Sequence, residues 1–165
     1  MAYKFTSDVF QISAGAKEAT ANTPLTTTIN LPLDSLSREI LVILYVDIDC
    51  NFPDLQMGVN SFCQVSLNDS NVGVQGISNP RVIAVAENAI ISDATGVVSF
   101  QNSEPRASNQ TEEVTVFVTA TDDLFLSVGG TNNVTRLANS QVRIYARRAR
   151  ADADTYAAIL TSQFN

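Results

Sequence analysis

Apolar and polar residues alternate along most of this chain with the period of two that is typical of β-strands. The clearest run covers residues 39–50. Its apolar face is formed by Ile40, Val42, Leu44, Val46, Ile48 and Cys50. The opposite face changes from apolar to acidic through Leu41, Ile43, Tyr45, Asp47 and Asp49. We therefore expect a central strand with one wholly apolar face, whose far end reaches solvent.

Shorter runs with the same period predict further strands before and after this one. They cover residues 9–12, 25–31, 59–67, 81–91, 97–101, 113–120, 124–128 and 141–147. The residues expected to point inward from two late strands are Val114, Val116, Val118, Val142 and Ile144. Turn residues such as Asn68–Asn71 and Gly129–Asn133 separate the runs at regular intervals. This pattern predicts an all-β protein, an antiparallel β-sandwich of about eight strands.

Helix is predicted only in a turn at residues 34–37 and in the tail after Ala151. The apolar residues of the tail are three or four positions apart, which indicates a short amphipathic helix or an arm lying on a neighbour. They are Tyr156, Ile159, Leu160 and Phe164. The expected organisation is an N-terminal strand and linker arm at 1–24, one sandwich domain at 25–150, and a tail at 151–165.

Composition agrees with a single folded domain that has its own core. The chain has 165 residues, of which 45% are hydrophobic and 16% charged. Its 10 Lys and Arg are outnumbered by 17 Asp and Glu, a net charge of −7 that argues against nucleic-acid binding over the whole surface. The N-terminus lacks the apolar core of a signal peptide, and no segment is apolar enough to span a membrane. We expect synthesis in the cytoplasm.

Histidine is absent, which removes many kinds of catalytic site. The chain has no imidazole base, no Ser-His or Cys-His nucleophile pair and no histidine-ligated metal. We therefore expect no enzymatic activity. Cys50 and Cys63 lie in apolar runs, which favours buried free thiols over the alternative, a cross-strand disulfide.

Three aspartates near the end of the central strand are the candidate metal site. Asp47 and Asp49 are two residues apart, so a strand places them on one side about 7 Å from each other, and Asp54 follows nearby. Such carboxylates suit calcium or a general acid/base pair. They also suit a strand end that leaves the core and discourages edge pairing, which is the interpretation we favour. The expected cofactor is none, with calcium as the alternative.

Half of the basic residues lie close together near the C-terminus. They are Arg136, Arg143, Arg147, Arg148 and Arg150. Arg143 and Arg147 share the outward face of the last strand, where guanidinium groups can bind phosphate or an acidic neighbouring subunit. A subunit contact is favoured over nucleic acid because the rest of the chain is acidic. A solvated strand end is the third interpretation.

The order of these elements resembles the single jelly-roll of viral capsid subunits. The resemblance is carried by the long strand at 40–50, the strands at 113–120 and 124–128, and the closing strand at 141–147 with its tail. It implies a structural protein of the virion, made in the host cytoplasm, that self-assembles through its edges and termini. Its partners would be copies of itself and other virion proteins, with Tyr156, Ile159, Leu160 and Phe164 as assembly contacts.

One departure from that family weighs against genome contact. Many small capsid proteins that package RNA have a basic N-terminal arm, whereas residues 1–24 contain only Lys4 and Lys17 against Asp8 and Glu18. The second hypothesis is a ligand-binding β-sandwich, a carbohydrate-binding or receptor-attachment domain that uses calcium at the three aspartates. Few aromatic residues are placed to stack on a sugar, which lowers this hypothesis.

Overall fold

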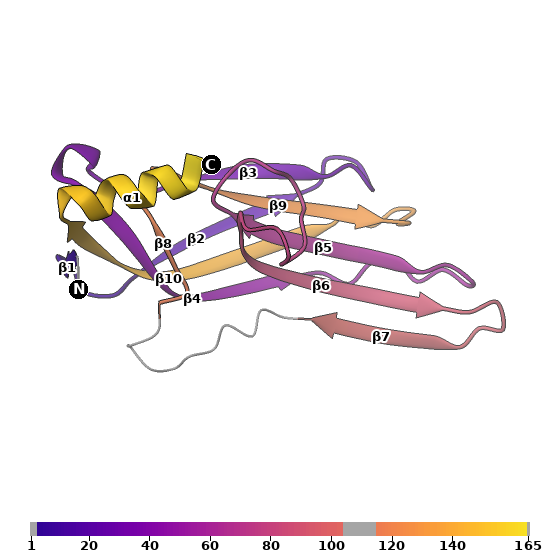
Figure 1. Cartoon of the computed structure of the whole chain (residues 1–165). Helices are drawn as coiled ribbons and strands as arrows, with labels where there is room; N and C mark the ends of the chain where they lie inside the picture. The colour runs from indigo at the N-terminus through magenta and orange to yellow at the C-terminus, as the bar shows by residue number, and fades with distance from the viewer. Residues whose placement is uncertain (1–2, 104–114, 165) are drawn as a thin grey trace.

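The computed structural model describes residues 3–103 and 115–164, which form two five-stranded antiparallel sheets, a short 3-10 helix and a C-terminal α-helix (Figure 1). The elements are β1 (Tyr3–Phe5), β2 (Phe10–Lys17), β3 (Leu25–Asn30), η1 (Ser35–Ser37), β4 (Glu39–Cys50), β5 (Ser61–Asn68), β6 (Val82–Ser92), β7 (Val98–Ser103), β8 (Phe117–Thr119), β9 (Asp123–Thr131), β10 (Asn139–Ala151) and α1 (Ala153–Phe164). Among the described helices, none is long and apolar enough to cross a membrane.

The strand order is that of a jelly-roll. The first sheet has the order β2–β10–β4–β8, with β1 also paired to β10, and the second has the order β3–β9–β5–β6–β7. If β1 and β7 are set aside, eight strands are left, and the first pairs with the last, the second with the seventh, the third with the sixth and the fourth with the fifth. This nesting of antiparallel pairs defines a jelly-roll sandwich. The all-β prediction is confirmed.

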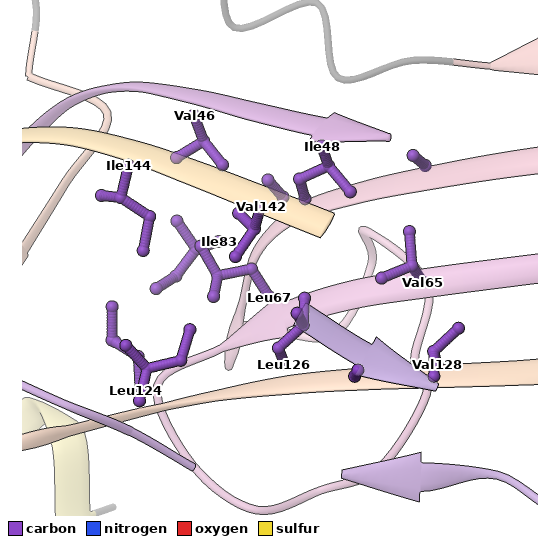
Figure 2. Packing of buried hydrophobic residues seen from close by; sticks show 14 of the residues in the cluster. Val46, Ile48, Val65, Leu67, Ile83, Leu124, Leu126, Val128, Val142 and Ile144 are labelled. Carbon is purple, nitrogen blue, oxygen red and sulfur yellow. The ribbon is translucent and has the colours of Figure 1, made fainter. Parts of the chain in front are cut away.

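Aliphatic side chains fill the space between the sheets. Figure 2 shows side chains of the first sheet facing those of the second; they are Val46, Ile48, Val142 and Ile144 from the first, and Val65, Leu67, Leu124, Leu126 and Val128 from the second. All of these are at most 3% exposed. The inward orientation predicted for Val142 and Ile144 is therefore confirmed.

The single apolar face predicted for the central strand is wrong, because β4 contains a β-bulge. Tyr45 pairs with Tyr145 but Ile43 pairs with Ala146, so Leu44 is the extra residue. An extra residue interrupts the alternation and exchanges the two faces of the strand. Before the bulge, Leu41 and Ile43 enter the core between the sheets; after it, the core residues are Val46, Ile48 and Cys50.

A second apolar cluster lies on the outer face of the first sheet, under α1. Its buried residues are Ile40, Val42, Ala120, Ala149 and Ala151, and the side chains packed against them are Tyr3, Phe5, Leu44, Val118, Tyr156, Ile159 and Leu160. Three of the residues predicted as assembly contacts, Tyr156, Ile159 and Leu160, therefore pack within their own subunit. The inward prediction for Val118 is also wrong, and Val114 lies outside the described residues.

The N-terminal segment and the cysteines complete the sandwich. β1 and β2, from the predicted N-terminal arm, both pair with β10 at the edge of the first sheet.

Cys50 and Cys63 are buried free thiols, as expected. The neighbouring Cys63 side chain, followed by burial, raises the pKa of Cys50, so this thiol stays protonated.

Candidate functional site

The outer face of the first sheet carries a polar groove in the half away from α1. The groove has a volume of about 540 Å³ and is lined by residues that include Ser13, Gly15, Asp47, Asp49, Gln141 and Arg143. Strand register places Arg143 between Ser13 of β2 and Asp47 of β4. Both charged residues are exposed. An arginine in this position can form charge-assisted hydrogen bonds with a partner.

The three predicted metal ligands do not come together. Asp54 lies in the loop between β4 and β5, and its Oδ2 atom accepts the backbone N–H groups of Val134, Thr135 and Arg136 at 2.9, 2.8 and 2.8 Å. These bonds, that of Arg136 first, lower the pKa of Asp54. Asp54 therefore anchors the loop between β9 and β10. Among the residues that the structure describes, no group of three His, Cys, Asp or Glu could hold a metal ion.

The arginines do not form one patch, because three of them make contacts within the subunit. Arg147 Nε donates to the Ser7 carbonyl at 3.1 Å, and its guanidinium lies 4.1 Å from the centre of the Phe5 ring. The guanidinium of Arg148 lies 5.5 Å from the centre of the Phe10 ring.

The remaining arginines divide into one that is bound and two that are exposed. Arg136 Nε lies 3.8 Å from Asp54 Oδ1, at the opposite end of β10 from Arg148. Arg143 and Arg150 are exposed on β10. These two are the predicted arginines best placed to meet a partner.

Three other aspartates stabilise turns or the start of a helix through hydrogen bonds with the backbone. Asp34, Asp93 and Asp152 each accept a backbone N–H within their own turn or first helical turn. The pKa of each is lowered, mainly by bonds from Ser37, Thr95 and Thr155 respectively. Hydrogen bonds that favour the ionised form make these carboxyls poor general acids.

Glu18 is a buried residue that sequence reasoning missed. It is 2% exposed, and its two carboxylate oxygens accept the N–H groups of Gly130 at 2.7 Å and Ala138 at 2.9 Å. A Cβ at position 130 would crowd the Asn133 side-chain amide and lie 3.2 Å from Glu18 Oε2, so any larger residue would displace these buried groups. The available signal was a lone acidic residue in a linker of small residues, between two predicted strands.

A polar network joins the loops at this end of the sandwich. Asn22 and Asn133 exchange two hydrogen bonds of 2.7 and 2.8 Å between side chain and backbone. Asn133 Oδ1 also accepts the N–H of Asp54 at 2.8 Å. The loops before β3, before β5 and before β10 are therefore tied together, and they form a well-connected platform.

Exposed apolar side chains gather on and beside this platform. We call them the loop-end patch: Phe52, Leu55, Met57, Val97, Phe100 and Val134. Met57 is 75% exposed and Val134 67%. The rings of Phe52 and Phe100 are 6.0 Å apart, and the Gly58 N–H donates to Ser92 Oγ at the end of β6 at 3.2 Å. Because these residues lie mainly in loops, no periodic pattern in the sequence marks them.

No protein-family model and no curated protein sequence matches this chain. Solved structures that are similar to it include viral capsid proteins. VP1 of Trichodysplasia spinulosa-associated polyomavirus is 10% identical over 88% of this chain and 97% of that one, with a TM-score of 0.39. Merkel cell polyomavirus VP1 is 6% identical over 92% of this chain and 99% of that one, with a TM-score of 0.41.

A plant virus gives a similar result. The turnip yellow mosaic virus structure is 11% identical over 90% of this chain and 99% of that one, with a TM-score of 0.33. The resemblance to viral capsid proteins that the strand pattern predicts is thus present, as a weak one at the level of the fold.

Proposed function

We propose that this chain is a non-enzymatic structural subunit of a virion, a capsid or capsid-associated protein that assembles with copies of itself and with other virion proteins. The observation that carries the proposal is the loop-end patch. Contiguous exposed apolar surface is uncommon on monomeric proteins and marks interaction sites. Here four of its six residues, Phe52, Leu55, Met57 and Val134, lie in loops that are tied together through Asp54 and Asn133, so this part of the surface is preformed for a contact.

The filled interior supports a role at the outer surfaces. Jelly-roll proteins that bind ligands or metals inside the sandwich need room and polar ligands there. In this chain, aliphatic residues such as Leu67 and Leu126 occupy the space between the sheets. The lowered pKa values of Asp34, Asp54, Asp93 and Asp152 have structural causes, as described above. These features of the described residues therefore favour a role in surface contacts over a role in catalysis.

Charge supports the same proposal in a narrower form. With a net charge of −7, copies of this chain meet more favourably where a cation faces an acidic surface. Arg143 and Arg150 fill that role in our proposal, whereas Arg136, Arg147 and Arg148 serve the subunit itself. The tail would contact neighbours through the side of α1 that faces away from the sheet, where Ala157 and Ala158 are exposed. Phe164 stays a proposed contact, and its side chain lies outside the described residues.

A pair of matched variants tests the proposal. Leu55→Ser with Met57→Ser should reduce the large assemblies seen by size-exclusion chromatography with light scattering and by negative-stain microscopy. The control is Ile77→Ser, because Ile77 is 67% exposed, between Leu55 at 57% and Met57 at 75%, but lies in the loop between β5 and β6. Circular dichroism checks that both variants fold. Equal assembly by both variants would remove the loop-end patch as support, and a wild-type protein that stays monomeric would contradict the proposal.

A further inference from the structure

β7 is an edge strand without the features that usually protect such strands. Among the described residues it pairs only with β6, and all six of its residues are at least partly exposed. Natural edges are blunted by charge, proline, bulges or short length. β8 has only three residues, and β2 carries Lys17, but Val98–Ser103 contains no charged residue and no proline.

The hydrogen bonds of the hairpin determine which residues of β7 point their backbone groups outward. The Asp93 N–H donates to the Val97 carbonyl at 3.1 Å, so these two form a hydrogen-bonded pair. Bonded and non-bonded pairs alternate in an antiparallel ladder. The register then assigns Ser99, Gln101 and Ser103 to bonds with β6. The N–H and C=O groups of Val98, Phe100 and Asn102 are directed away from it.

From this arrangement we infer that β7 pairs with β7 of a second copy, antiparallel and about a two-fold axis at Phe100. In this register Phe100 faces Phe100 and Val98 faces Asn102, so every outward residue has a partner. The second sheets of the two copies become one continuous sheet. This inference rests on the proposed function and names one contact through which the subunits would associate.

Charge and side chains favour a second copy as the occupant. Two chains of net charge −7 repel each other, and an uncharged strand is where they can approach most closely. Phe100 is 63% exposed beside Phe52. The two-fold pairing places two Phe100 rings side by side on one face, a favourable cross-strand aromatic pair. Backbone pairing and apolar burial would thus occur together.

Proline substitution tests the outward hydrogen bonds. Asn102→Pro removes an outward N–H and leaves the bonds with β6 in place, whereas Asn102→Thr keeps that N–H. Sedimentation should show self-association weakened by about tenfold or more for the proline variant, with little change for the threonine variant. Equal association of the two variants, both folded by circular dichroism, would overturn the inference.

Cross-linking tests the register without relying on the proline variant. Phe100→Cys should form a disulfide-linked dimer on mild oxidation, whereas Ser99→Cys, on the opposite side of the strand, should not. The native Cys50 and Cys63 are buried. No excess of dimer for Phe100→Cys would overturn the inference, and the proposed function would stand if large assemblies still form. Cross-linked dimers without larger assemblies would support the β7 contact and contradict the proposed function.

Discussion

The outer face of β4 has two halves that differ in what covers them. Before the bulge at Leu44, Ile40 and Val42 are buried in the cluster against which side chains of α1 and β1 pack. After it, Asp47 and Asp49 are exposed beside a polar groove. The same strand, paired to the same neighbour β10, is thus a second core in one half and a solvent-facing surface in the other. The difference shows that α1, and not the sheet alone, determines which half of this outer face is buried and which half is left to contact a partner.

Removal of α1 is the change with the largest expected effect on this comparison. A chain ending at Asp152 exposes Ile40 and Val42 and loses the packing of Tyr156, Ile159 and Leu160. We expect the free energy of unfolding to fall by about 3 to 5 kcal/mol. Urea denaturation measures it. An unchanged midpoint would mean that the helix adds nothing to the subunit and that the covered half is stable without it.

A double-mutant cycle sharpens the same point at one residue. Val42→Ala should cost about 2 kcal/mol in the full chain, because Val42 is 0% exposed in the cluster against which α1 packs. In the chain ending at Asp152, where Val42 is already uncovered, the same change should cost much less. Equal costs in the two backgrounds, again from urea denaturation, would show that Val42 and α1 are not coupled.

The start of α1, which covers the buried half, should lose stability in acid. Asp152 accepts the Thr155 N–H at 2.8 Å at the start of α1, and this bond lowers the pKa of Asp152 from its usual 3.8. An aspartate whose pKa is lower in the folded than in the unfolded state stabilises the fold at pH values above its unfolded-state pKa. This stabilisation is lost as the pH falls through the folded-state pKa. Asp152→Asn should therefore reduce the thermal midpoint at neutral pH and flatten its fall below about pH 4. Parallel pH profiles for the two proteins would contradict this assignment.

Charge changes in the open half should have the smallest effect on stability. Asp47→Asn or Arg143→Glu should alter the free energy of unfolding by less than about 0.5 kcal/mol, because both residues are exposed. Arg143→Glu should weaken assembly, and the difference from wild type should shrink as salt is added. Light scattering at two ionic strengths measures this. A stability loss as large as that of Val42→Ala would mean that the open half is also structural.

The sequence predicted β10 better than β4 for a physical reason. Alternation from Val142 to Ile144 is marked by polar neighbours, whereas every residue from Ile40 to Leu44 is apolar and nothing marks the bulge. Of the strand predicted at 113–120, the described residues form β8 at Phe117–Thr119, and residues 113 and 114 lie outside the described part of the chain. Local alternation therefore predicts strands well, and predicts their facing only where polar residues interrupt the apolar ones.

The candidate site was harder to predict because its partners are distant in the chain. Arg147 and Arg148 lie against Phe5, Ser7 and Phe10, about 140 positions away. Only the fold brings these segments together, so the sequence did not separate the arginines used within the subunit from those left exposed. Asp54 is a similar case, since the loop that it anchors begins after β9.

Sedimentation velocity of the intact chain over a wide range of concentration tests the central claim most directly. A structural subunit that self-assembles should give species much larger than its 17.8 kDa monomer, with a proportion that rises with concentration. Negative-stain images of the same samples should show regular particles. A single folded species of monomer mass at every concentration would contradict the account.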